Sequence, residues 1–163
     1  MSFYACAETR RYSMSTNLLD YVRLATFNVD ASCALSDHWS IIAGARYNPF
    51  VFNEGNPDKE FQYRQKSFSV GARWWMNQIW SGWWISGKLR YQKYEVGGIV
   101  SRNVEAGDRG GLGCYVGYTH PISSHWCLES GLGVWGGQSW LNNGENVWFA
   151  RPDDLMLSFV YVF

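Results

Sequence analysis

No stretch of the chain is apolar for the roughly 20 residues that a membrane-spanning helix needs. Charged residues make up 17% of the sequence, below the roughly 25% of an average globular protein. They sum to a net charge of zero, so we expect no nucleic-acid partner. The four cysteines form no CxxC pair and have no zinc-type spacing with histidine. The sequence therefore shows no motif for a membrane helix or a zinc site.

Aromatic residues and glycine are abundant instead. Aromatics account for 18% of the chain, with ten Trp, ten Tyr and nine Phe, and there are 17 glycines. The mean hydropathy is nevertheless slightly negative, at −0.26. A length of 163 residues suits one domain. This combination is typical of membrane strands in which apolar and polar residues alternate.

The end of the chain shows this alternation most clearly. The side chains that would share one face of a final strand are Leu155, Leu157, Phe159, Tyr161 and Phe163. A transmembrane barrel turns such a face to lipid, whereas a soluble barrel buries it. A closing strand with a C-terminal aromatic resembles the terminal signal of outer-membrane barrels. A soluble edge strand has a similar pattern, so this strand alone leaves both interpretations open.

Turn and strand signals divide the chain into eight expected strands. Short connections alternate with longer ones rich in Gly, Asn, Asp and Glu, except after the first strand. This pattern predicts an all-β fold, an eight-stranded antiparallel up-and-down transmembrane β-barrel over residues 16–163, after an N-terminal periplasmic segment, 1–15. We expect it in the outer membrane of a Gram-negative bacterium, with both termini periplasmic. The expected strands are 16–22, 25–35, 39–50, 62–76, 83–96, 110–120, 126–138 and 154–163.

The parity of the charged residues separates the two faces of the wall. Mid-strand charges fall together on the face opposite the aromatic and aliphatic residues. In a soluble barrel they would face water, but in a membrane barrel they must face inward, where side chains fill the lumen of eight strands. The sequence thus predicts an interior network of four cations and two anions: Asp30, Arg46, Arg73, Lys88, Arg90 and Glu129.

Two further groups of aromatic residues are expected at the two ends of the barrel. The first is a periplasmic girdle at the short-turn end, formed by Trp39, Trp74, Trp75, Trp83, Trp126 and Phe163. The second group lies near the long loops and is a candidate contact with a larger outer-membrane protein; it comprises Phe50, Phe52, Trp140, Trp148 and Phe149. Alternatively, this second group forms only the outer interfacial belt. Outer-membrane lipid and lipopolysaccharide are the other expected partners.

Several stretches also resemble an uncharacterised Bacteroidota family of eight-stranded outer-membrane barrels, a domain of unknown function. The most specific is Tyr47-Asn48-Pro49-Phe50; others are Asp37-His38-Trp39-Ser40, Ala72-Arg73-Trp74-Trp75 and His125-Trp126-Cys127-Leu128-Glu129. The resemblance implies fold and location but no activity. It also implies that Ser32 replaces an acidic residue, which would leave the interior network short of an anion.

No catalytic constellation is evident in the sequence. His38, His120 and His125 all fall at the short-turn end, away from the loops where a barrel enzyme that modifies lipids would hold its site. We therefore predict no catalytic residue, no cofactor and no metal. The first hypothesis is a non-enzymatic integral outer-membrane barrel, with a structural, anchoring or accessory role. A lipid-modifying barrel enzyme and a soluble lipocalin-like ligand binder remain alternatives.

Overall fold

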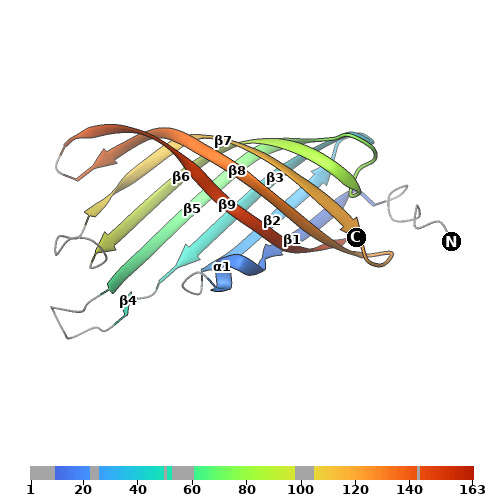
Figure 1. The fold of residues 1–163 in the computed structure, drawn as a ribbon, viewed down its shortest axis with the longest axis horizontal. Helices are drawn as coiled ribbons and strands as arrows, with labels where there is room; N and C mark the ends of the chain where they lie inside the picture. Colours follow the sequence, from blue (N-terminus) through green and yellow to red (C-terminus); the bar gives the residue numbers. More distant parts are fainter. Residues whose placement is uncertain (1–9, 23–25, 50, 53–60, 98–104, 143) are drawn as a thin grey trace.

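Eight long antiparallel strands form a closed barrel (Figure 1). The structure, a computed structural model, describes residues 10–22, 26–49, 51–52, 61–97, 105–142 and 144–163. The strands of the wall are β1 (Tyr12–Asn17), β2 (Phe27–Ala34), β3 (Trp39–Asn48), β5 (Phe61–Trp75), β6 (Gly82–Gly97), β7 (Glu105–Pro121), β8 (Trp126–Leu141) and β9 (Asn146–Val162). The two-residue strand β4 (Val51–Phe52) pairs only with β5, and the short helix α1 (Leu18–Val22) follows β1.

Each strand of the wall pairs with the next one along the chain, and β1 pairs with β9 to close the barrel. Tyr12 and Phe163 exchange backbone hydrogen bonds of 3.3 and 3.0 Å, so β1 begins where β9 ends. The predicted closed eight-stranded antiparallel barrel is therefore confirmed. Among the described residues, none of the helical segments is long and apolar enough to cross a membrane.

The start of the barrel differs from the sequence prediction. The predicted strand 16–22 is instead the end of β1 followed by α1, and β1 begins at Tyr12, four residues earlier than expected. The Asn17 side chain ends the strand, because its Oδ1 accepts a hydrogen bond from the backbone N–H of Leu19 at 3.3 Å, as a helix N-cap does. As a result, β1 and β2 are the shortest strands of the wall.

The predicted long loop 139–153 is also mostly strand, because β8 continues to Leu141 and β9 begins at Asn146. The register between these strands shifts: Leu132 pairs with Leu155, but Val134 pairs with Pro152. The extra residue in β9 is a β-bulge, which reverses the alternation of side chains beyond it. Strict alternation cannot be followed through a bulge, so the sequence pattern ended the strand there.

An apolar cluster fills the turn end of the barrel. The turn between β5 and β6 folds into this end, where Ile79 and Trp80 are buried. Trp80 has a φ of 63°, which is uncommon for a bulky residue, and its indole N–H donates to the Arg10 carbonyl at 3.0 Å. The buried members of the cluster are Trp75, Ile79, Trp80, Trp84, Tyr115, Cys127, Met156, Val160 and Val162. Together they close this end of the lumen.

Packing inside and outside the wall predicts unequal effects of substituting two glycines. A methyl group at Gly117 would overlap the Trp84 ring and the Ser130 carbonyl oxygen, whereas one at Gly87 meets nothing within 4 Å. Gly117→Ala should therefore lower the free energy of unfolding by about 1–3 kcal/mol. Gly87→Ala, the matched control, should change it by less than about 0.5 kcal/mol. Urea unfolding of the detergent-solubilised protein, followed by tryptophan fluorescence, measures both; equal stabilities would contradict the packing.

Candidate functional site

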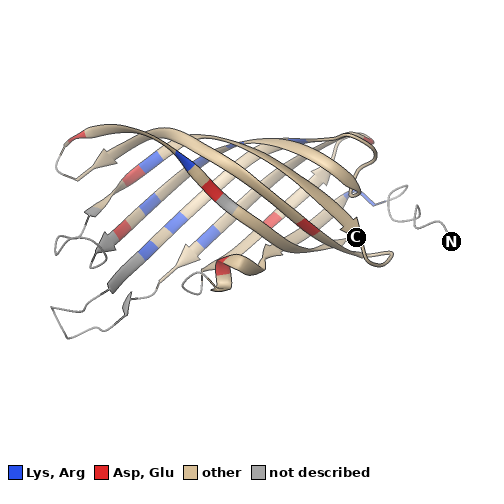
Figure 2. Cartoon of the chain, viewed as in Figure 1, with Lys and Arg blue, Asp and Glu red and all other residues tan. Residues whose placement is uncertain are grey.

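Charged side chains line the lumen between the apolar cluster and the opposite end of the barrel. Figure 2 shows both signs of charge in the middle of several strands. The structure places all six predicted interior residues there: Arg73, Lys88, Arg90 and Glu129 are buried, and Asp30 and Arg46 are half-buried. This part of the lumen is therefore polar and charged, although Lys, Arg, Asp and Glu are seldom buried unless they are paired.

Arg73 and Glu129 form the pair closest to the apolar cluster. Two hydrogen bonds of 2.7 and 3.0 Å join the guanidinium to both carboxylate oxygens, and each side chain is only 5% exposed. The Thr119 hydroxyl donates to the same carboxylate at 3.0 Å. The guanidinium also lies over the Trp84 ring, 3.9 Å from its centroid. Ion pairing, hydrogen bonding and a cation–π contact thus stabilise these buried charges together.

Two more pairs follow along β6, one and two inward positions beyond Ser86. Lys88 Nζ lies 3.9 Å from Asp30 Oδ2 and 5.2 Å from the centroid of the Tyr115 ring. Arg90 donates to Asp153 Oδ1 at 2.7 Å, and the Tyr115 hydroxyl donates to the other oxygen of that carboxylate. Tyr115 therefore connects the two pairs across the lumen.

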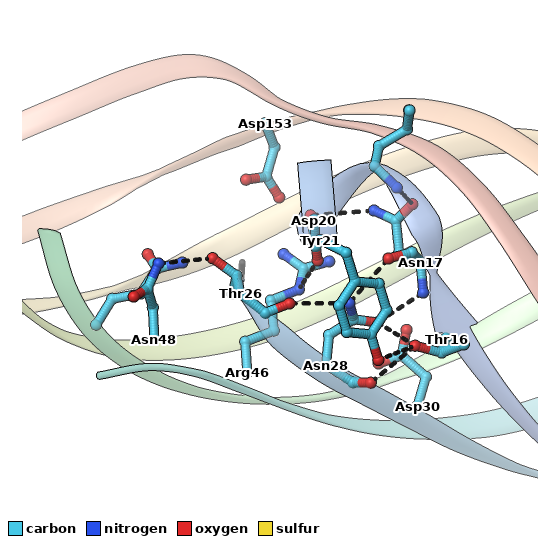
Figure 3. A network of polar contacts seen from close by, with 12 residues as sticks. Thr16, Asn17, Asp20, Tyr21, Thr26, Asn28, Asp30, Arg46, Asn48 and Asp153 are labelled. Carbon is cyan, nitrogen blue, oxygen red and sulfur yellow. Dashed lines mark hydrogen bonds and ion pairs between the residues drawn. The ribbon is translucent and has the colours of Figure 1, made fainter. Parts of the chain in front are cut away.

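The fourth pair depends on α1. Arg46 Nε lies 3.2 Å from Asp20 Oδ2, and the Asn17 amide donates to Asp20 Oδ1 at 3.1 Å (Figure 3). Asn17 and Asn28 are joined twice, because the Asn17 backbone N–H donates to Asn28 Oδ1 at 2.6 Å and the Asn28 amide donates to the Asn17 carbonyl at 2.9 Å. This network fixes the carboxylate of a short helix inside a β-barrel.

Asp20 and Asp153 are functional residues that the sequence prediction missed. They bring the anions to four, one for each of the four paired cations. The predicted shortage of anions is therefore wrong. The sequence predicts a strand at Asp20, which lies in α1 instead. It predicts a loop at Asp153, which the β9 bulge turns inward. The signal that could have found them is the charge count itself, since buried cations require partners.

The outer wall carries aromatic residues at its turn end. Trp39, Trp83, Trp126 and Phe163 are each about half exposed there, and Trp74 is half-buried. Trp75 does not belong to this girdle, because it is fully buried and its indole N–H donates to Ser40 Oγ at 3.0 Å. Adjacent residues of a strand point to opposite faces, so Trp74 and Trp75 cannot both face outward.

A second aromatic belt surrounds the opposite part of the wall. Its members are exposed and come from five different strands: Phe27, Tyr47, Phe68, Tyr91 and Trp140. Most outward positions between the two belts are apolar or small, as in β6, where Ile85, Gly87 and Leu89 separate Trp83 from Tyr91. Where the structure describes side chains, no Asp, Glu, Lys or Arg lies on the outer wall between the belts. The outer surface is thus an uncharged band with aromatic edges.

The five expected loop-end aromatics separate in the structure. Trp140 and Trp148 are exposed, by 42% and 78%. Phe149 is not a surface residue of this kind: it is half-buried and packs on the Trp135 ring, with 4.7 Å between centroids. The β9 bulge accounts for this, because it turns odd-numbered side chains inward beyond it. Phe50 and the side chain of Phe52 lie outside the described residues.

The remaining candidates for chemistry have structural contacts. His38 Nδ1 lies 2.9 Å from the Trp75 carbonyl oxygen, and the His125 ring stacks on Tyr161. Cys33, Cys114 and Cys127 are free thiols, and Cys6 lies outside the described residues. Within the described part of the chain, no group of three or more His, Cys, Asp or Glu residues could hold a metal ion. The charged lumen is the polar arrangement considered below.

Comparison with protein families finds a match over the whole chain. The model of the family described as "Protein of unknown function (DUF3575)" matches residues 1–163, so the chain belongs to this family. No curated protein and no solved structure matches the chain. The expected domain of unknown function is thus found, while its bacterial group and its membrane remain predictions.

The Arg73–Glu129 pair predicts a large effect of removing one charge. Glu129→Ala leaves a buried guanidinium without its carboxylate, which should lower the free energy of unfolding by about 3–5 kcal/mol. Glu95→Gln is the matched control, because Glu95 lies 3.9 Å from Arg64 and both side chains are half exposed. It should cost less than about 1 kcal/mol. Urea unfolding in detergent distinguishes them, and an unchanged Glu129→Ala protein would contradict the buried network.

Proposed function

We propose that this member of the DUF3575 family is a non-enzymatic integral β-barrel of a Gram-negative outer membrane, with Bacteroidota as the group that the resemblance implies. Its role would be structural or anchoring, or that of an accessory subunit of a larger outer-membrane complex. The observation that carries the proposal is the distribution of polarity across the wall, with charges inside and an uncharged, aromatic-edged band outside.

The energetics of the two environments favour lipid around this band. Outward residues such as Leu89, Leu132 and Leu155 are 56–66% exposed, so water would contact a continuous apolar surface around the barrel. Soluble monomers rarely expose contiguous apolar patches larger than a few hundred Å². In a bilayer the same surface contacts lipid instead of water, so its exposure carries no hydrophobic cost. The inward charges do not contact lipid at all.

The height of the band supports the same environment. On β3 the outward positions run from Trp39 to Tyr47, a stretch of nine residues. At about 3.3 Å per residue and a tilt of about 40°, they cover roughly 20 Å along the barrel axis. With the flanking aromatic residues this approaches the roughly 25 Å apolar band of outer-membrane barrels.

The lumen favours a closed barrel over a channel or a ligand carrier. The four ion pairs, the Tyr115 and Trp135 side chains and the apolar cluster fill it from the middle to the turn end. A lipocalin-like carrier would instead need an apolar cavity. A lipid-modifying enzyme would need a catalytic group at the loop end, whereas the three histidines lie near the turns.

The accessory role rests on a shallow apolar groove of about 610 Å³ on the outer wall. Its lining combines small residues, such as Ala72, Gly87 and Cys114, with larger side chains such as Trp39, Trp74 and Leu132. Small residues let neighbouring elements approach closely in lipid. A larger outer-membrane protein is the partner that fits such a groove.

Charge placed on the outer band tests the membrane environment. Leu89→Arg should destabilise the barrel in lipid bilayers by about 2–4 kcal/mol, the cost of a cation on the lipid face near mid-bilayer. Leu35→Arg is the matched control, because Leu35 is similarly exposed (65% against 61%) but lies in the turn after β2. Unfolding from phosphatidylcholine vesicles measures both. Equal stabilities of the two variants would argue for a soluble barrel.

The closed lumen predicts electrical silence. Planar-bilayer recordings of the pure protein should show no stable conductance, because paired charges and the apolar cluster leave no continuous water path. A general diffusion porin inserted under the same conditions provides the positive control. Reproducible large conductance steps from the pure protein would contradict a filled lumen.

A further inference from the structure

Two lysines face each other on the outer wall. Lys66 of β5 and Lys93 of β6 are direct cross-strand partners, and both are exposed. Like charges placed opposite each other destabilise a sheet. The next outward pair toward the turns is Phe68 and Tyr91, which belong to the second aromatic belt. The chain therefore maintains an unfavourable pair at the edge of its apolar band.

The described neighbouring carboxylates form no ion pair with these two lysines. Asp108 of β7 is the other cross-strand partner of Lys93, but its carboxylate accepts a hydrogen bond from the Tyr91 hydroxyl at 2.8 Å. Lys66 Nζ lies over the Tyr47 ring, 5.4 Å from its centroid. Among the described residues, neither lysine has a carboxylate within the 4.0 Å of an ion pair.

A hollow brings further polar groups to the same place. It encloses about 500 Å³ and is lined by both lysines and by Arg64 and Asn142, among other residues of β3, β5, β6 and β7. Arg64 contacts Glu95 at 3.9 Å, with both side chains half exposed. The described charges of this lining are three cations and two carboxylates, so an anion is the ligand that it fits.

The position of the lysines identifies the kind of anion. Along β5 and β6 they are the first outward charges beyond the uncharged band, the level at which lipid phosphates lie if the barrel is membrane-inserted as proposed above. Phe68, Val70 and Leu89 continue the same outer face toward mid-band and are exposed. A ligand with both a phosphate and acyl chains satisfies the two parts of this surface, whereas a free phosphate satisfies only one.

We propose that Lys66 and Lys93 form a binding site for the phosphate group of an anionic lipid. The phosphate lies between the two ammonium groups and removes their repulsion. The acyl chains pack along the outer face of β5 and β6. The inference depends on the proposed membrane location and names one specific lipid site within it.

Binding of defined lipids to the detergent-solubilised full chain, observed by native mass spectrometry, tests this site. The probes are bisphosphorylated lipid A, its dephosphorylated form and inorganic phosphate. The phosphorylated lipid should bind most tightly. Lys66→Gln with Lys93→Gln should weaken its binding by about 30-fold, since each lysine near a charged lipid surface contributes about fivefold. Replacing both lysines with arginine should retain binding.

Two further variants separate binding from folding. Lys66→Glu places an acid opposite Lys93, and its other cross-strand partner is the uncharged Tyr47, so the unfolding midpoint should not fall while binding of the phosphorylated lipid is lost. Arg11→Gln removes an exposed cation at the opposite end and should leave binding unchanged. Equal binding of the dephosphorylated lipid, occupancy by inorganic phosphate alone, or full binding by the Lys66→Glu variant would overturn the site. Insertion of the same samples into phosphatidylcholine vesicles is measured in parallel, so failure of the membrane proposal is distinguishable.

Discussion

Each charge inside this barrel must find its opposite within the wall, because the lumen of eight strands leaves little room for water. Among the described residues, four cations and four carboxylates of the lumen satisfy this requirement in pairs at distances of 2.7–3.9 Å. A buried pair adds little stability compared with apolar packing, but a single unpaired charge costs several kcal/mol. The interior charges therefore select one register of the strands but add little to the free energy of unfolding. Any shift in register would separate partners such as Arg73 and Glu129, which lie on β5 and β8.

This requirement also explains why polar and apolar residues lie on opposite faces of the wall. Since the inward positions carry polar groups above the Trp75–Trp84 cluster, most apolar side chains have only the outward positions left. The pleat of a strand then produces both features from one alternating pattern. The charged lumen and the apolar exterior are for this reason a single property of the sequence, and the proposal of a membrane location rests on that property.

Regular alternation made the strands and the six interior charges predictable from sequence, because position along a strand alone decides the face. It failed where local geometry departs from the pleat. The β9 bulge reverses parity, which hid Asp153 and turned Phe149 inward, and the Asn17 cap ends β1 early, which placed Asp20 on a helix. Trp75 shows a different limit of the sequence pattern. Its place near a short turn predicts the correct end of the barrel, but the outward position belongs to its neighbour Trp74 and Trp75 is buried. The bulge depends on the pairing of β9 with β8, which a single sequence does not display, and the Asn17 cap is a local contact that the alternation of side chains does not reveal.

The short first strand has a consequence for the mechanical strength of the wall. β1 pairs with β2 over four residues and with β9 over five, whereas β6 and β7 pair over fifteen. The β1–β9 pairing also joins residues separated by most of the chain, so its loop-closure entropy is the largest of any seam. The side chain of Asn17 adds bonds across this seam, accepting from the Leu157 N–H at 3.0 Å and donating to the Leu155 carbonyl at 3.5 Å. Under lateral tension, the wall should open first beside β1, where the backbone pairing is short and is supplemented by the Asn17 side-chain amide.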